Sequence, residues 1–253
     1  LLKVPGASNT VLESYIPYSK ESMDTFLNKT PDHYCSLETC LSMAANAFKK
    51  SKEIDQRTKT RYLLGIAITA NLATTYEKKG EHKFFIVIQA YNYTKYLECY
   101  LIKGNRTRKQ EEELITNCAL SLLAESCGFE YDLPKIDEEI KINKIKAEKS
   151  WEKLFNNKVD YISNNQNSPE LIFPGSFNPL HEGHLKMKEL AEKRTGMHTT
   201  FEICANNADK PPLTFYEIKR TIDQFQNDES WILTSAGRFS EKAKMFPNSV
   251  FII

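Results

Sequence analysis

Two histidines three residues apart follow a glycine-containing turn in the last third of the chain. The string Pro-Gly-Ser-Phe-Asn-Pro-Leu-His-Glu-Gly-His occupies residues 174–184, directly after the apolar run 171–173. Residues 185–193 have the composition of a helix, so the string joins a strand to a helix. Backbone N–H groups of such a turn, the positive end of a helix dipole and two imidazoles can all be directed at one anion. The spacing therefore predicts a phosphate-binding turn in which His181 and His184 share a helix face.

The other residues of the turn suit the same chemistry. Gly175 has no Cβ and lets the backbone approach a ligand closely. Ser176 offers a hydroxyl and an N–H, and Asn178 is biased away from helical geometry because it precedes a proline. Lys210, in the loop after the next predicted strand, is expected to reach the same pocket as a point charge. Arg220 is expected to be a surface residue rather than a substrate contact.

Strands and helices alternate through residues 169–253. The expected strands are 170–173, 199–204, 231–234 and 249–253, and the expected helices are 182–194, 214–226 and 238–245. Alternation of this kind predicts parallel strands joined by right-handed crossovers. Ligands bind at the carboxyl ends of the strands in such sheets, and the turn at 174–184 lies at one of these ends.

The first part of the chain, residues 1–130, predicts a second α/β domain. The expected strands are 10–17, 62–69, 83–90 and 93–101, and the expected helices are 36–48 and 106–127. Tyr91-Asn92 would connect a hairpin and Gly128 would cap the last helix. Between Pro134 and Lys158, twelve of the 25 residues are charged, and 156–169 are rich in Asn and Ser. Residues 131–168 are therefore expected to form a solvated linker between two α/β domains.

Composition narrows the range of partners and compartments. The 253 residues include 34 Lys and Arg and 33 Asp and Glu, so their charges nearly cancel. No overall positive charge favours binding to nucleic acid or to an anionic membrane surface. No apolar stretch is long enough to span a bilayer. The six cysteines form no CxxC pair, which favours free thiols in a reducing compartment such as the cytoplasm. We expect no protein-held metal site, and the sequence leaves the oligomeric state open.

Both ends of the chain are unusual for a complete protein. The chain begins at Leu1 rather than at a methionine and ends on the apolar run 249–253. A core strand needs a neighbour to cover it, so we expect the chain to be a piece of a longer protein.

The string at 174–184 resembles the (T/S)-G-(S/T)-F-(D/N)-P-x-H-x-G-H motif of the HxGH nucleotidylyltransferase superfamily. That superfamily includes the nicotinamide and nicotinate mononucleotide adenylyltransferases, phosphopantetheine adenylyltransferase and the cytidylyltransferases. The resemblance implies a Rossmann-like parallel sheet and transfer of AMP or CMP from ATP or CTP to a phosphorylated small molecule, with release of pyrophosphate. A late Ser-Ser/Thr-x-x-Arg type motif of the superfamily does not occur in this sequence, so the domain is expected to be incomplete here.

The resemblance also implies roles for individual residues. His181 and His184 would contact the triphosphate as catalytic residues, with His184 nearest the reacting phosphorus. Ser176 and the N–H groups of residues 175–177, Phe177 among them, would hold phosphate oxygens. Mg²⁺ would enter with the triphosphate and bridge its oxygens. The acceptor, including nicotinamide mononucleotide, is not selected by the motif.

The first 128 residues show a looser resemblance to the C-terminal domain of the competence-damage protein CinA, which deamidates nicotinamide mononucleotide in bacteria. It is carried by Leu-Lys-Val-Pro-Gly-Ala-Ser at residues 2–8, by Tyr18-Ser19, by the strand end at Thr69 and by Gly-Asn-Arg at 104–106. The resemblance implies a ligand site that includes Tyr18, Thr69 and Arg106. The family's serine motif is absent, and Met23 stands at the position of its lysine. We therefore expect a degenerate ligand-binding or scaffold domain rather than a deamidase.

The order of the two domains resembles a fusion family known from plants and protists. Two alternatives to the transferase stay open from sequence alone. One is a nucleotide-binding or scaffold protein without turnover, and the other is an amidohydrolase that works from the N-terminal part.

Overall fold

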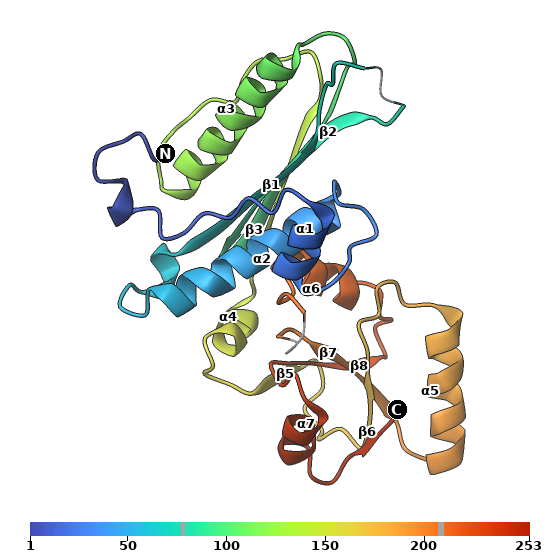
Figure 1. Ribbon diagram of the computed structural model, residues 1–253. Helices are drawn as coiled ribbons and strands as arrows, with labels where there is room; N and C mark the ends of the chain where they lie inside the picture. The colour runs from blue at the N-terminus through green and yellow to red at the C-terminus, as the bar shows by residue number, and fades with distance from the viewer. Residues whose placement is uncertain (77–78, 207–209) are drawn as a thin grey trace. The chain divides into compact units, whose positions relative to one another are not determined.

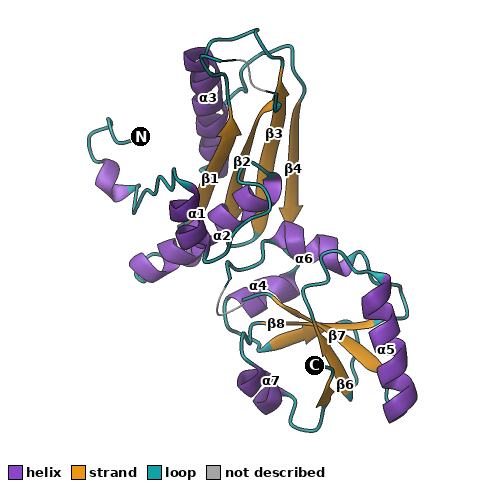
Figure 2. Ribbon diagram, turned by 45° about the vertical axis from the view of Figure 1, so that its right-hand side comes forward, coloured by secondary structure: helices purple, strands orange, loops and turns teal. Residues whose placement is uncertain are grey.

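The computed structural model describes residues 1–76, 79–206 and 210–253. Its contacts divide the chain into two compact units, Leu1–Lys144 and Ile145–Ile253, and each contains one sheet. Figures 1 and 2 show the elements of both units. The architecture is mixed α/β, as the sequence predicts.

The first unit is a four-stranded sheet in the order β1-β2-β3-β4. The strands are β1 (Leu64–Asn71), β2 (His82–Ala90), β3 (Tyr93–Leu101) and β4 (Ile140–Lys146), and the first three pair antiparallel. The helices are α1 (Lys20–Leu27), α2 (Leu37–Ile54) and α3 (Arg108–Ser126), with short 3₁₀ turns at Ala7–Asn9 and Thr60–Tyr62. The predicted hairpin connection at Tyr91-Asn92 is confirmed by the β2–β3 register.

Side chains along β2 point alternately to the two faces of the sheet, and both faces are packed. Phe84, Ile86 and Ile88 belong to one buried cluster with Leu114 and Leu122 of α3. Helix α2 approaches the sheet closely at Gly65, where a Cβ would lie 2.3 Å from the Ala44 carbonyl oxygen and the Phe48 nitrogen. Figure 2 shows α3 on one side of the sheet and α1 and α2 on the other.

The predicted strand at 10–17 is wrong. These residues join neither sheet of the described chain, and Ile16 is 83% exposed. A segment whose apolar side chains remain exposed has no buried face to hold it against a neighbouring strand.

The segment 131–168, expected to be a solvated linker, contains regular elements that belong to both units. It contains β4, helix α4 (Lys149–Phe155) and strand β5 (Tyr161–Ser163), and the division between the units falls after Lys144. Trp151 and Leu154 are buried in the second unit, and Ile140 packs against the core of the first. A few apolar anchors suffice to fix these elements, while the charged residues between them remain solvated and dominate the composition.

The second unit is a five-stranded sheet in the order β5-β8-β7-β6-β9. The strands β6 (Leu171–Pro174), β7 (Thr199–Cys204), β8 (Ser230–Thr234) and β9 (Val250–Phe251) are parallel, and β5 pairs antiparallel with β8 at one edge. The helices are α5 (Glu182–Thr195), α6 (Phe215–Ile222) and α7 (Phe239–Met245). The seven strands and helices expected from 169 onward are all present, and Figure 2 shows the sheet with α5 and α7 at its sides.

The strand order places β6 at the turning point of the topology. The chain passes from β6 to β7 and β8 on one side, and then returns to β9 on the other side of β6. The carboxyl end of a strand flanked in this way is the usual ligand-binding position of an open parallel sheet. The turn that follows Pro174 occupies this position.

Among the residues that the structure describes, no helix is both long and apolar enough to cross a bilayer.

Candidate functional site

Phe177 anchors the turn between β6 and α5 to the core of the second unit. It is 1% exposed and has a φ of 43°, in the left-handed region that bulky residues rarely occupy. Its ring centroid lies 5.1 Å from those of His184 and Phe201 and 5.5 Å from that of Phe173. Burial of this ring fixes the backbone on either side of it, so Ser176 and Asn178 are both exposed at the surface.

Gly175 is needed for a reason that the sequence does not reveal. A Cβ at this position would lie 2.5 Å from the Phe177 ring, so any side chain here would collide with the anchor. The Gly175 N–H donates to the Glu202 carbonyl oxygen at 3.0 Å and continues the β6–β7 pairing. The expectation that this N–H holds a phosphate is therefore not met in this conformation.

His181 and His184 come together as predicted at the start of α5. His181 is the exposed N-cap residue and His184 lies half-buried in the first turn, with the two rings stacked at a centroid distance of 3.7 Å. A Cβ at Gly183 would lie 3.0 Å from the His181 ring, so the glycine leaves room for that ring. The His181 N–H donates to His184 Nδ1 at 3.3 Å, which assigns the neutral tautomer of His184 with its proton on Nε2. His184 can therefore donate a hydrogen bond to an anion without being charged.

The environment of His184 predicts a measurable titration. Burial lowers the pKa of His184, and the neighbouring His181 lowers it further. Because the folded-state pKa lies below the unfolded value, protonation of His184 disfavours the folded state as the pH falls. We expect an NMR titration of this imidazole to have its midpoint below about 6.5, the ordinary value for histidine. A bound triphosphate should raise the midpoint, because an anion favours the imidazolium; a midpoint above 6.5 in the free protein would contradict this description.

Arg220 of α6 and Gln224, two residues after the end of this helix, also hold the turn. The Gln224 side chain accepts a hydrogen bond from the Leu180 N–H at 2.8 Å and donates to the Phe177 carbonyl oxygen at 2.9 Å. Arg220 donates to Asn178 Oδ1 at 2.6 Å. Arg220 is thus a support of the turn rather than only a surface residue. Gln224 was not predicted, since a lone glutamine 40 residues from the motif gives no signal in the sequence.

The remaining predicted nucleotide-binding residue, Lys210, is exposed in the loop after β7. Because β7 is the parallel neighbour of β6, this loop leaves the sheet at the same edge as the turn. The residues just before it, 207–209, lie outside the described part of the chain. Within the described residues, no group of three or more His, Cys, Asp or Glu side chains could hold a metal ion.

The predicted N-terminal ligand residues line two different cavities of the first unit. Tyr18 and Thr69 line one of about 610 Å³ together with Met23, whereas Arg106 lines another of about 890 Å³. The Thr69 hydroxyl donates to the Tyr34 carbonyl oxygen at 2.9 Å, and Arg106 forms a bidentate pair with Glu138. The three residues therefore do not form a single site in this structure.

The second unit combines two features that suit an anion-binding site. A parallel sheet turns at β6, and the strand leads through a tight turn to paired imidazoles at a helix N-terminus. Residues 172–240, from β6 to the start of α7, match the family model described as cytidylyltransferase-like. This match supports a place for the domain among the nucleotidyltransferases. No curated protein and no solved structure matches the chain.

Proposed function

We propose that the second unit is a nucleotidylyltransferase that transfers AMP or CMP from ATP or CTP to a phosphorylated small molecule. The observation that carries the proposal is the stacked pair His181–His184 at the start of α5, inside the segment that matches the cytidylyltransferase-like family. The Nε2 proton assigned to His184 supports a role as a neutral hydrogen-bond donor to phosphate.

In the proposed reaction, a phosphate oxygen of the acceptor attacks the α-phosphorus of the triphosphate. The new phosphorus–oxygen bond forms as the bond to the β-phosphate bridging oxygen breaks, and pyrophosphate leaves with that electron pair. The reaction needs no protein nucleophile, so the protein contributes positioning and charge stabilisation. His184 would donate from Nε2 to the reacting phosphate, with His181, the Ser176 hydroxyl and the N-terminus of α5 holding neighbouring oxygens.

The role of Mg²⁺ follows from the donors that the turn offers. Imidazoles, a hydroxyl and an amide do not make the carboxylate-rich oxygen set that Mg²⁺ prefers, and the described residues contain no metal-binding cluster. The metal would therefore arrive as part of the substrate, on the triphosphate oxygens. Lys210 would supply an additional positive charge to the same phosphates.

A panel of substrates tests the proposal and identifies the acceptor. The full chain is incubated with Mg²⁺ and either ATP or CTP, together with nicotinamide mononucleotide, nicotinate mononucleotide, phosphopantetheine or simple phosphate esters. We expect pyrophosphate release with one pairing, and nicotinamide mononucleotide is the acceptor we propose first. Binding of a triphosphate without release for any acceptor would favour a nucleotide-binding protein without turnover. Absence of both binding and release would contradict the proposal.

A further inference from the structure

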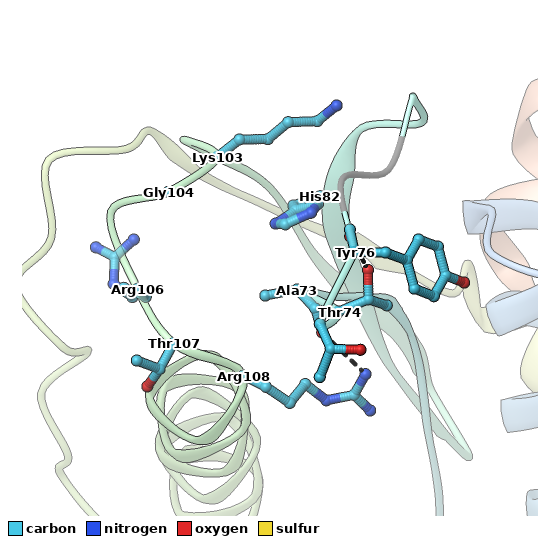
Figure 3. A pocket seen from close by; sticks show the side chains of 10 residues that line it. Ala73, Thr74, Tyr76, His82, Lys103, Gly104, Arg106, Thr107 and Arg108 are labelled. Carbon is cyan, nitrogen blue, oxygen red and sulfur yellow. Dashed lines mark hydrogen bonds between the residues drawn. The ribbon is translucent and has the colours of Figure 1, made fainter.

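A cavity of about 890 Å³ lies at one end of the sheet in the first unit. It is bounded by residues that follow β1, by the first residue of β2 and by the loop from β3 to α3, as Figure 3 shows. The side chains in its lining that can carry a positive charge are His82, Lys103, Arg106 and Arg108. Its volume is within the range of pockets that bind small molecules. It is separate from the cavity lined by Tyr18 and Thr69.

His82 is held in this cavity by a buried carboxylate. The imidazole Nδ1 lies 3.0 Å from Glu111 Oε1, and the other carboxylate oxygen accepts the Ala73 N–H at 2.6 Å. His82 is 7% exposed and Glu111 is 0% exposed. Both oxygens of Glu111 are therefore engaged, and the direction of the imidazole is fixed by its Nδ1 side.

This arrangement leaves the opposite edge of the His82 ring for a ligand. Glu111 does not line the cavity, whereas His82 does, so the ring presents Nε2 to the cavity while Nδ1 faces the carboxylate. Figure 3 shows the imidazole across from the loop that carries Lys103, Gly104 and Arg106. In the imidazolium form both ring nitrogens carry a proton, so Nε2 of that form can donate a hydrogen bond to an anion while Nδ1 donates to Glu111.

Among the described residues that line the cavity, Lys103, Arg106 and Arg108 are charged and none carries a carboxylate. Two carboxylates hold the guanidiniums from outside the lining: Glu138 pairs with Arg106 and Glu112 pairs with Arg108 at 2.6 Å. Arg106 keeps the pKa of Glu138 at about 2, so this support remains ionised throughout the ordinary pH range. Fixed cations need little reorganisation to receive a ligand.

We propose that this cavity binds a small molecule that carries an oxyanion, either phosphate or carboxylate, between His82 and Lys103. The protonated imidazole donates from Nε2 to the oxyanion, with Glu111 fixing its orientation. The Lys103 ammonium, which donates to the Lys79 carbonyl oxygen at 3.2 Å, contributes a second positive charge. The site is independent of the transferase turn, because the first unit alone supplies its residues.

The test follows the His82 imidazole by NMR in the full chain labelled with ¹⁵N-histidine. His82 is one of five histidines, and the loss of its signal in His82→Gln assigns it. The probes are inorganic phosphate, adenosine monophosphate and malonate, each titrated separately. We expect at least one probe to shift the His82 signal to saturation, and the set that binds shows whether phosphate or carboxylate is preferred.

Three further variants separate this site from the turn at 174–184 and from non-specific charge. The shift should persist in a His181→Ala/His184→Ala protein, which lacks the two imidazoles of that turn. Lys103→Ala should weaken binding about tenfold, the loss typical of one charge-assisted contact. Lys141→Ala, which removes an exposed lysine of β4 outside the cavity, should bind as the unmodified chain does. A His82 signal unmoved by all three probes, or equal affinities for Lys103→Ala and Lys141→Ala, would overturn the proposal.

Discussion

His184→Ala should abolish detectable pyrophosphate release by the second unit while leaving its fold intact. The substitution removes the donor closest to the proposed reacting phosphate, and loss of one such donor slows catalysis by about 10²–10³-fold. His184 is half-buried and belongs to a helix start whose anchor, Phe177, remains in place. The measurement is pyrophosphate release with the productive pairing of triphosphate and acceptor, combined with circular dichroism to verify the fold.

His198→Ala provides the matched control for this substitution. His198 lies beyond α5 in the same unit, is largely exposed and has Glu192 Oε1 at 3.7 Å from its Nδ1. His198 has no role in the proposed reaction, so His198→Ala should release pyrophosphate at the same rate as the unmodified chain. If His184→Ala and His198→Ala turned over equally fast, the proposed role of the stacked pair would be lost.

The second unit could be predicted from the sequence because its signals are local. Strands β6, β8 and β9 contain short apolar runs, and α6 begins after a capping residue, Thr214. The pairing of His181 with His184 followed from their spacing at a helix start. The same local signals give the hairpin of β2 and β3 in the first unit.

The supports of the turn could not be predicted, because they depend on contacts between distant residues. The Phe177 ring lies so close to Gly175 because Phe177 has a positive φ. The hydrophobic pattern of the sequence does not reveal such a backbone conformation. Gln224 reaches the turn only because α6 packs beside it. The same limitation explains the segment 131–168, where a few buried anchors such as Trp151 outweigh the charge of their neighbours.

Lys242→Met should destabilise the second unit more than any surface substitution. Lys242 on α7 donates to Glu202 Oε2 at 2.6 Å, and the other Glu202 oxygen accepts the Thr234 hydroxyl. Both charged residues are buried, at 6% and 0% exposure. Removing the ammonium leaves an uncompensated carboxylate in the sheet, which costs about 3–5 kcal/mol. Glu202 also lies beside the turn, since its carbonyl oxygen accepts the Gly175 N–H.

The unfolding of this unit can be followed selectively, because both tryptophans of the chain, Trp151 and Trp231, belong to it. In urea titrations monitored by tryptophan fluorescence, Lys242→Met should lower the midpoint strongly. The exposed control Lys219→Met, which removes an i,i+4 pair with Asp223, should change the free energy of unfolding by less than about 1 kcal/mol. The double variant Glu202→Leu/Lys242→Met should recover much of the loss, because two apolar side chains leave no buried charge. Equal midpoints for Lys242→Met and Lys219→Met would show that the buried pair contributes no more to this fold than an ion pair at its surface.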